Sequence, residues 1–399
     1  MFLKNLIKRN PQFIKTVVHL HQTWKIPANS YVLDLDTIEK NASLMATEGQ
    51  KLGLKVYPMT KQLGRNVKAM QVLARQGLDA YVAVDMACAR PINAAGYKIG
   101  HLGHLVQIPM AETDVAASFE PFYWTVFNFE KARAASGSSK KLNRRQALMA
   151  RLFATGDTFY MGHEGGFLAD DILHVADEFD KLSNAYFAGI TSFPTLLFDV
   201  KKSDVYLTPN MTTLEKAANA LRAAGRKDIE INAPGTTSTS VMKMLADAGA
   251  TQVEPGHGLT GTTPLHAVRD LPESPAILYL SEISHIYNGE PFCFGGGLYI
   301  DPVFPDYDVK ALVGSDANTF LNHPISVKIP PPNAIDYYGI LSPEASRNVR
   351  VGDSVVFGFR VQAFVTRAFI VPISGISSGK PIVEGVYTSD GRKTNWPEW

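Results

Sequence analysis

The sequence predicts an α/β protein in which a (β/α)8 barrel is followed by a second, C-terminal β domain. Three observations predict this arrangement. Short apolar runs alternate with longer amphipathic stretches between residues 55 and 255, polar residues gather where these runs end, and the alternation stops after residue 265. Such alternation is typical of parallel sheets whose two faces are covered by helices. A chain of 399 residues is long enough for two cores.

The chain opens with residues 1–26, in which apolar residues mix with Lys, Arg and His at helical spacing. This segment lacks the unbroken apolar core of a signal peptide and predicts an amphipathic helix. We therefore expect residues 1–30 to form an N-terminal helical segment. A strand at residues 31–36 and a helix at 37–53 are expected next. That first strand precedes the barrel runs, so it could join the later β domain.

Eight apolar runs follow and are expected to be the barrel strands. They are residues 55–60, 80–85, 104–109, 124–128, 147–153, 185–192, 229–234 and 251–255. The barrel domain is expected to span residues 31–265. Because the C-terminal ends of barrel strands carry the active site in this fold, polar residues there are candidate site residues. They are Lys61, Asp85, Ser192, Asn232, Glu254 and His257.

Past residue 265 the sequence changes to strand-like pieces broken by Gly, Pro, Asn and Asp, which predicts a separate β domain over residues 266–399. These pieces are residues 276–287, 292–300, 325–329, 354–374 and 382–388.

Composition narrows the class of partner. Lys and Arg total 39 against 38 for Asp and Glu, so a weak net field gives no reason to expect nucleic acid or an anionic membrane surface. No stretch reaches the roughly 20 apolar residues of a bilayer span. Only two cysteines occur, which argues against disulfides and favours a reducing compartment, with the cytoplasm as the expected location. A small molecule is the expected partner.

Lys61 closes the first apolar run of the barrel. Desolvation there can lower the pKa of a lysine and make its amine a nucleophile for a Schiff base. A solvated or salt-bridged lysine is the plain alternative.

Two loops after the last barrel runs are candidate anion sites. Gly256, Gly258 and Gly261 follow the eighth run and let backbone amides approach a phosphate closely. Residues 232–240 follow the seventh run and precede a helix, whose N-terminus favours negative charge. For either loop by itself, ordinary turn and cap residues are the better explanation.

Several motifs carry a family resemblance. DLDTIEKNA at residues 34–42, Thr-Lys at 60–61 and EPGHGLTG at 254–261 resemble the fold-type-III pyridoxal-phosphate enzymes, the alanine racemase and ornithine decarboxylase group. Segments such as MTKQLGRN, LSEISH, CFGGGLYI, IDYYG and FVTRAF extend the likeness, to an alanine-racemase-like branch, over nearly the whole chain.

The resemblance implies that pyridoxal 5'-phosphate is the cofactor. Lys61 would carry it and move the α-proton of an amino acid, and Glu254 would be the acidic partner of the pyridine nitrogen. A carboxylate there favours a protonated, electron-withdrawing ring. Alanine racemase has an arginine at that position, so Glu254 puts simple alanine racemization in doubt and leaves decarboxylation, elimination or retro-aldol cleavage open.

Other roles are implied in the same way. His163 lies near the family's ring-stacking histidine, and a tyrosine of the second domain, Tyr337 or Tyr338, would meet the phosphate. The remaining cofactor contacts would be Ser192, Asn232, Gly235, Thr236, Thr237, Gly256, His257 and Gly258.

A racemase needs a second acid/base, which in this family comes from the partner subunit. Cys293 is the candidate by likeness to the decarboxylases and Tyr299 by likeness to the racemases, while a buried apolar cysteine is the plain alternative. Some relatives bind a divalent ion, but His285 and Cys293 have no third ligand at useful spacing, so we expect no metal.

These points together predict a homodimeric enzyme that racemises an amino acid, with active sites at the subunit interface. A decarboxylase or another α-carbon lyase is the alternative within enzymes. A non-catalytic cofactor-binding protein is the alternative outside them, although such carriers lack a second domain.

Overall fold

The structure is a computed structural model that describes residues 1–331, 333–344 and 349–398. The chain divides into two compact units. The barrel unit comprises Ser43–Thr60 and Ala74–Gly256, and the β unit comprises Met1–Ala42, Lys61–Leu73 and His257–Trp399. The domain boundaries expected from the sequence stay predictions; this division differs from them chiefly by giving the first 42 residues to the β unit.

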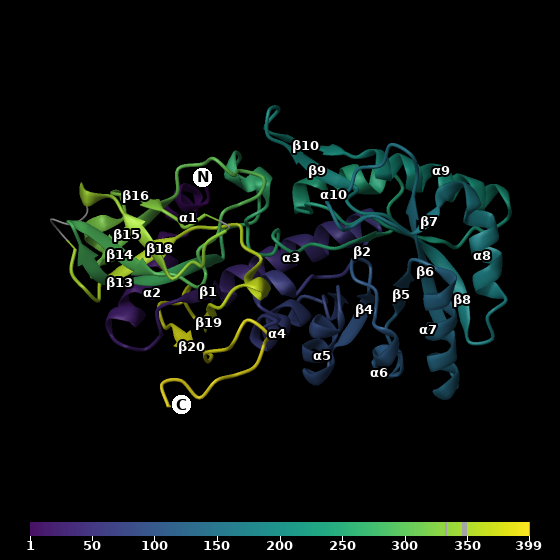
Figure 1. Cartoon of the computed structure of the whole chain (residues 1–399), viewed down its shortest axis with the longest axis horizontal. Helices are drawn as coiled ribbons and strands as arrows, with labels where there is room; N and C mark the ends of the chain where they lie inside the picture. The colour runs from purple at the N-terminus through teal and green to yellow at the C-terminus, as the bar shows by residue number, and fades with distance from the viewer. Residues whose placement is uncertain (332, 345–348, 399) are drawn as a thin grey trace. The chain divides into compact units, whose positions relative to one another are not determined.

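Eight parallel strands form the sheet of the barrel unit, which confirms the (β/α)8 fold with a separate β domain (Figure 1). A parallel bridge between Met59 and Val82 joins the first strand of this sheet to the last and so closes it. In sheet order the strands are β2 (Lys55–Val56), β12 (Gln252–Val253), β11 (Glu230–Asn232), β8 (Ala185–Thr191), β6 (Gln146–Phe153), β5 (Tyr123–Val126), β4 (Lys98–Leu102) and β3 (Ala80–Ala83).

Helices connect these strands, as expected for parallel neighbours, which need a crossover. The connecting helices are α4 (Val67–Arg75), α5 (Met86–Ala94), α6 (Thr113–Ser118), α7 (Phe129–Lys141), α8 (Ile172–Asp180), α9 (Pro209–Ala223) and α10 (Thr239–Asp247), and α3 (Leu35–Leu52) precedes β2. Short strands β7 (Phe167–Leu168), β9 (Leu196–Asp199) and β10 (Asp204–Leu207) are inserted. Asp85, a candidate site residue from the sequence, is the N-cap of α5, where its side chain accepts from the Cys88 amide.

The third barrel strand was expected at residues 104–109, and this was wrong. The strand is β4 at Lys98–Leu102, and Gly103, with φ of +78°, ends it. Residues 98–102 look polar because they contain Gly100 and His101. Gly100 is required there, since a Cβ would lie 2.4 Å from Cδ1 of Tyr57, and His101 is buried because hydrogen bonds satisfy it.

The sheet of the β unit contains a closed ring of six antiparallel strands. The ring order is β14 (Glu290–Phe294), β17 (Tyr338–Leu341), β16 (Ile325–Lys328), β15 (Lys310–Gly314), β18 (Ser354–Phe357) and β13 (Ile277–Tyr287), and β13 pairs again with β14. An irregularity between Ile283 and His285 lets β13 serve both neighbours.

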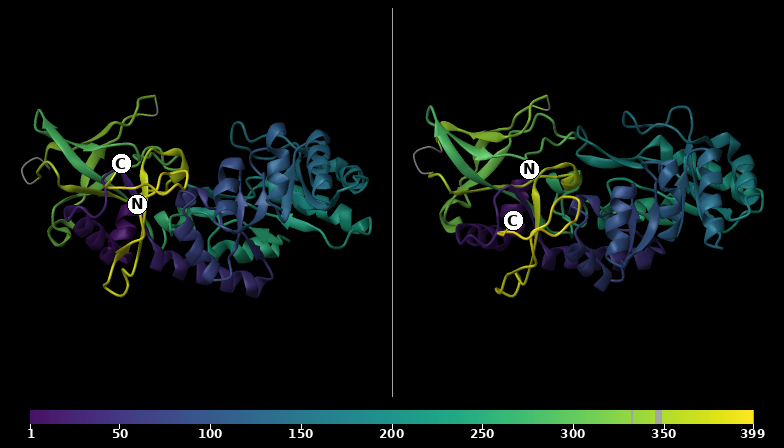
Figure 2. Two further views of the ribbon diagram at one scale, coloured as in Figure 1. Left: turned by 90° about the horizontal axis from the view of Figure 1, so that it is seen from below. Right: turned by 60° about the horizontal axis from the view of Figure 1, so that its bottom comes forward.

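The early strand β1 (Ser30–Asp34) belongs to the sheet of the β unit. It pairs antiparallel with β13 and parallel with β19 (Phe369–Ser374), and β20 (Ile382–Val383) forms the edge beyond β19. Figure 2 shows the N-terminal helices in purple and the C-terminal segment in yellow within this unit.

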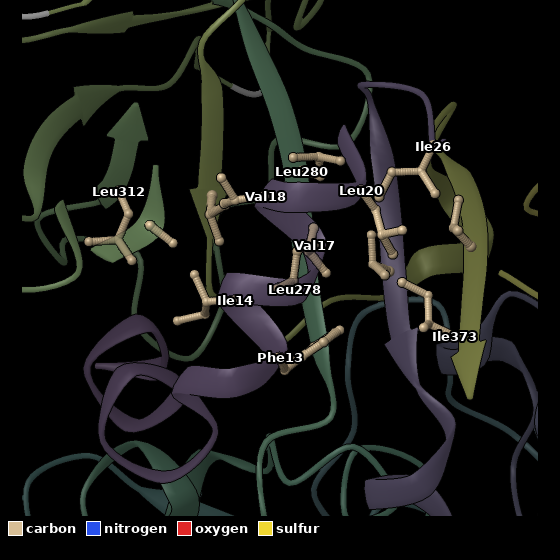
Figure 3. Close-up of a cluster of buried hydrophobic side chains, with 14 of the residues drawn as sticks. Phe13, Ile14, Val17, Val18, Leu20, Ile26, Leu278, Leu280, Leu312 and Ile373 are labelled. Atoms are coloured by element: carbon tan, nitrogen blue, oxygen red, sulfur yellow. The ribbon is translucent and has the colours of Figure 1, made fainter. Parts of the chain in front are cut away.

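The N-terminal segment forms two helices, α1 (Phe2–Arg9) and α2 (Pro11–Gln22), rather than one. The break falls at Asn10 because Pro11 restricts the preceding backbone, and the Asn10 side chain caps α2 by accepting from the Phe13 amide. The apolar face of α2 packs on β13 and its neighbours, as Figure 3 shows for Val17 and Leu278. A short helix, α11 (Ala317–Phe320), packs against the same core. No helix within the described residues is long and apolar enough to cross a membrane.

Candidate active site

A row of polar side chains crosses the interior of the barrel unit. Glu254 follows β12, and its carboxylate oxygen Oε1 accepts from Nδ1 of His101 on β4 at 2.6 Å and from Nδ2 of Asn232 on β11 at 2.9 Å. Thr125 on β5 contacts Nε2 of His101 at 2.5 Å, and the Thr191 hydroxyl on β8 donates to Oδ1 of Asn232 at 2.8 Å. Residues on or next to five strands of the sheet therefore fix one carboxylate.

Glu254 is ionised although it is buried. Burial by itself would raise its pKa, but the charges of His104 and His101, with the hydrogen bonds from His101 and Asn232, outweigh burial and lower the pKa. Nε2 of His104 lies 3.1 Å from Oε2 of Glu254. Among the described residues, however, no donor is aligned for a hydrogen bond to Oε2.

The loop after β11 provides buried hydroxyls at a helix N-terminus. Thr237 and Ser238 lie directly before α10, and their hydroxyl oxygens have no hydrogen-bond partner among the described residues. Gly235 in the same loop allows close approach of backbone, because a Cβ there would lie 2.8 Å from both Cβ and O of Leu196. Thr236 donates its amide to the Leu196 carbonyl. This loop has the features of an anion site.

Ser192 and Gly256 also lie in the barrel unit. Ser192 follows β8, is buried, and accepts a hydrogen bond from Nδ2 of Asn210 at 3.1 Å. Gly256 is two residues beyond Glu254. The barrel unit thus holds Ser192, Asn232, the 235–237 loop and Glu254 at the C-terminal ends of neighbouring strands, as the sequence predicts for barrel strand ends.

His163 lies in the loop that follows β6, beside aromatic rings. Its ring centroid is 5.7 Å from that of Phe193 and 5.8 Å from that of Tyr160. Arg151, on β6, is fully buried and donates to the carbonyls of His104, His163 and Phe193. Burial lowers the pKa of Arg151 to about 10. This arginine ties three loops of the barrel mouth together.

Lys61 is the first residue of the short helix η1 (Lys61–Leu63) and follows Thr60, the last residue of the first barrel segment. Within the β unit its Nζ lies 5.5 Å from the ring centroid of Phe364, and the Arg65 guanidinium lies 5.3 Å from the same ring. The lysine is half-buried. Both cations therefore make cation–π contacts with the ring of Phe364.

His257 belongs to a cluster of charged groups in the β unit. Its Nε2 lies 2.9 Å from the Val361 carbonyl, and burial, followed by the charges of Arg360 and Lys61, lowers its pKa well below the usual range. The imidazole is therefore neutral at pH 7, and Nε2–H donates to that carbonyl. Arg360 makes a two-pronged ion pair with buried Asp301, at 2.7 and 2.6 Å.

The two candidates for the second acid/base differ in environment. Cys293 on β14 is fully buried, and burial raises the pKa of its thiol to about 12. Tyr299 lies in the segment after β14 and is half-buried. Burial raises the pKa of Tyr299, whereas the nearby Arg360 lowers it. Tyr299 is the more accessible of the two groups.

Tyr337 and Tyr338 lie at the start of β17. Tyr337 is 64% exposed, and the Arg367 guanidinium lies 5.8 Å from its ring centroid. The ring of Tyr338 packs against His285, Phe292 and Phe294. Gly258 lies one residue beyond His257 and is buried.

His101 and His104 were not among the residues predicted from the sequence. Both are buried, and one of them is on the strand that was placed wrongly. The repeat GHLGHL at residues 100–105, interpreted as a strand followed by its loop, was the signal that could have found them. Arg151, Asp301 and Arg360 were not predicted either, because nothing in their local sequence distinguishes them from ordinary charged residues.

One group among the described residues has the spacing of a metal site. Ligand atoms of His101, His104 and Glu254 lie within 4.8 Å of one another. Each of the three side chains already contacts another member of the group. The ring of His285, which the sequence offered as a ligand with Cys293, stacks on Phe292 instead. That the chain binds no metal stays a prediction.

Comparison with known proteins agrees with the resemblance carried by the motifs. Residues 33–264 match the family described as alanine racemase, N-terminal domain, and residues 278–383 match that described as YhfX-like, C-terminal domain. The chain is 37% identical over 391 residues to the uncharacterized protein YhfX of Escherichia coli (strain K12), covering 98% of this chain and 99% of that protein.

Two solved structures share the fold. D-threonine aldolase from Filomicrobium marinum is 14% identical with a TM-score of 0.67, covering 92% of this chain and 96% of the aldolase. An alanine racemase from Clostridium difficile 630, in complex with cycloserine, is 16% identical with a TM-score of 0.62, covering 90% and 98%. The chain therefore belongs to the alanine racemase family, in its YhfX-like branch.

Proposed function

We propose that this chain binds pyridoxal 5'-phosphate and racemises an amino acid. The observation that carries the proposal is the buried, ionised Glu254, which keeps an oxygen without a hydrogen bond inside a barrel of the alanine racemase family. His104 lies 3.1 Å from this oxygen and compensates its charge, but it is not aligned for a hydrogen bond, so Oε2 can still accept one from a bound group.

The residues present fit this cofactor at both of its ends. Among the described residues no donor is aligned with Oε2 of Glu254, and a protonated pyridine nitrogen would be one. The hydroxyls of Thr237 and Ser238 have no hydrogen-bond partner in the described part of the chain and lie at the N-terminus of α10, where a phosphate is favoured.

Lys61 would hold the cofactor covalently, with Glu254 at the pyridine nitrogen and His163 at the ring face. The phosphate would be bound by Ser192, Gly235, Thr236, Thr237, Gly256, His257 and Gly258, with Tyr337 or Tyr338. Asn232, which donates to Glu254, would instead act at the nitrogen end of the cofactor. Bound pyridoxal phosphate supplies an electron-withdrawing ring that stabilises negative charge at the α-carbon of an amino acid.

Racemization requires one group that removes the α-proton and another that returns a proton to the opposite face. We assign Lys61 to one face. Cys293 and Tyr299 are the candidates for the other face, contributed by the partner subunit of a homodimer. Burial raises the pKa of both groups, but Cys293 is fully buried whereas Tyr299 is half-buried, so access favours Tyr299.

The visible spectrum of the purified protein after loading with the cofactor tests covalent attachment. We expect an absorption band that K61A lacks. K40A, which changes a lysine elsewhere in the chain, is the control and should keep the band. A wild-type protein without the band, or a K61A variant that retains it, would contradict the proposed attachment.

The product tests the reaction. Racemization of a single L-amino acid gives the D-enantiomer with unchanged mass, measured by chiral chromatography and mass spectrometry. Exchange of solvent deuterium into the α-position detects proton removal even without net reaction. No exchange with any of the twenty amino acids would favour a non-catalytic cofactor-binding protein instead.

A lyase acting at the α-carbon is a second candidate, and Glu254 favours it. A carboxylate partner keeps the ring protonated and strongly electron-withdrawing, which serves bond cleavage as well as proton transfer. The fold is also that of a D-threonine aldolase. Release of carbon dioxide, ammonia or an aldehyde in the same incubations would identify this class.

A further inference from the structure

The two carboxylate oxygens of Glu254 differ in their hydrogen bonding. Oε1 accepts two hydrogen bonds, from His101 and Asn232, whereas no donor among the described residues is aligned with Oε2. All the donors that hold the carboxylate therefore act on one side of it. The lone pairs of Oε2 can therefore still accept a hydrogen bond.

The protonation of His101 at Nδ1 follows from the charge of its partner. An ionised carboxylate can only accept hydrogen bonds, so Nδ1 must carry the hydrogen across the 2.6 Å contact. The other ring nitrogen, Nε2, is 2.5 Å from Oγ1 of Thr125, a hydroxyl that can either donate or accept. The imidazole is thus held at both ends, and its side chain is fully buried, as is that of Glu254.

Removing His101 would leave Glu254 with one neutral donor, Asn232, and the His104 imidazole 3.1 Å from Oε2. A buried carboxyl with fewer donors takes up a proton more readily. It would also be freer to rotate about its Cγ–Cδ bond, because Oε1 would lose one of its two hydrogen bonds. Either change would remove the ionised acceptor that Oε2 presents.

We propose that His101 is a positioning residue for Glu254: its Nδ1–H fixes Oε1 and so presents Oε2, ionised, to the pyridine nitrogen of the cofactor. The inference rests on the proposed function, because it assigns a partner to an oxygen of the same site. Thr125 acts one contact further out by holding the ring of His101.

The readout is the ionisation of the cofactor's ring nitrogen rather than catalysis. Holoenzyme is prepared with pyridoxal phosphate labelled with ¹⁵N in the ring, and the nitrogen chemical shift is measured, since it separates protonated from unprotonated pyridine. His101→Leu removes the donor. His101→Asn is the matched control, because its amide nitrogen can donate from about the place of Nδ1. Glu254→Gln supplies the reference for an unprotonated ring.

The wild type and H101N are expected to give the protonated signal, and H101L the signal of E254Q. The visible band must persist in H101L, which shows that the cofactor is still attached to Lys61. A folded H101L that keeps the protonated signal would overturn the proposal while leaving the proposed function intact. A wild type without bound cofactor would instead contradict the proposed function.

Two further measurements keep the test decisive. If H101L does not fold, T125V takes its place, because it frees Nε2 of His101 with little change in volume. It is expected to give a partly unprotonated ring, and an unchanged signal would overturn the proposal. Stoichiometric divalent metal in the purified wild type, lost in the His101 variants, would also overturn it, since the group would then be a metal site.

Discussion

At the scale of the residue, Glu254 and Cys293 show how burial acts in opposite ways. Glu254 is buried with cationic and hydrogen-bonding partners, and its pKa falls. Cys293 is also buried, and burial outweighs its hydrogen bonds with Ser281 and the backbone, so its pKa rises to about 12. Both groups are removed from water, but only Glu254 has partners that keep it ionised, whereas Cys293 stays protonated.

The thiol of Cys293 is expected to be unreactive in the folded protein. With a pKa of about 12, roughly 10⁻⁴ of the molecules carry a thiolate at pH 8, and the thiolate is the reactive form. In a C88A background, where Cys293 is the only cysteine, iodoacetamide should label the native protein at least about 10³ times more slowly than the unfolded protein.

Mass spectrometry over a time course measures this labelling. The wild type provides a comparison, because its other cysteine, Cys88, is also buried. Rapid labelling of native Cys293 would show that its thiol is accessible and reactive. Cys293 would then again be a candidate for proton transfer.

The sequence allowed the cofactor-facing residues of the barrel to be proposed, and the reason is local. Lys61 comes directly after an apolar run, and Glu254 and Asn232 lie in the last part of one, so their place near a strand end could be inferred from the run itself. The residues that control them could not be inferred in this way. His101 acts on Glu254 across 153 positions of the chain, and only the closed barrel makes them neighbours.

At the scale of the element, β4 shows why a buried strand can lack an apolar sequence. Position 100 requires glycine because the ring of Tyr57 occupies the place of a side chain. His101 can be buried because Glu254 and Thr125, which lie on or next to other strands, form hydrogen bonds with both of its ring nitrogens. The hydrophobic pattern is therefore a good guide to strands packed by apolar side chains, such as β3, and a poor one to strands that contain a close approach or a polar network.

Gly100→Ala is expected to destabilise the protein by about 1–3 kcal/mol, because its Cβ would overlap the Tyr57 ring. Gly137→Ala is the matched control. Gly137 lies within α7 and is exposed, and a Cβ added there would meet no atom within 4 Å, so alanine should stabilise by about 0.5–1 kcal/mol.

Denaturant unfolding of both variants beside the wild type measures these changes. Equal effects of the two substitutions would show that backbone entropy, and not the contact with Tyr57, governs position 100.

At the scale of the whole molecule, the proposed dimer makes a prediction about mixed subunits. K61A lacks the cofactor lysine and Y299F lacks the proposed second proton group, so each homodimer should be inactive. If Tyr299 serves the partner's site, a mixed dimer has one complete site. Random re-association of equal amounts should then restore about a quarter of wild-type activity.

Mixing after partial unfolding and refolding, followed by the racemization assay, tests this. K61A mixed with K61A, treated in the same way, is the control. If Lys61 and Tyr299 of one chain serve the same site, mixing will restore nothing. Light scattering on the wild type establishes independently whether it is a dimer.

The pairing of β1 determines the order in which the chain can fold during synthesis. β1 lies between β13 and β19, whose partners Leu280 and Phe369 are made about 250 and 339 residues after Ser30. The barrel strands, in contrast, are complete by Val253. Until β13 leaves the ribosome, both edges of β1 lack their partners, and the edge that pairs with β19 and part of the core around α2 stay open until the last part of the chain follows. The earliest residues of this protein are therefore among the last to be sheltered, and they are the segment that a nascent-chain chaperone has most reason to bind.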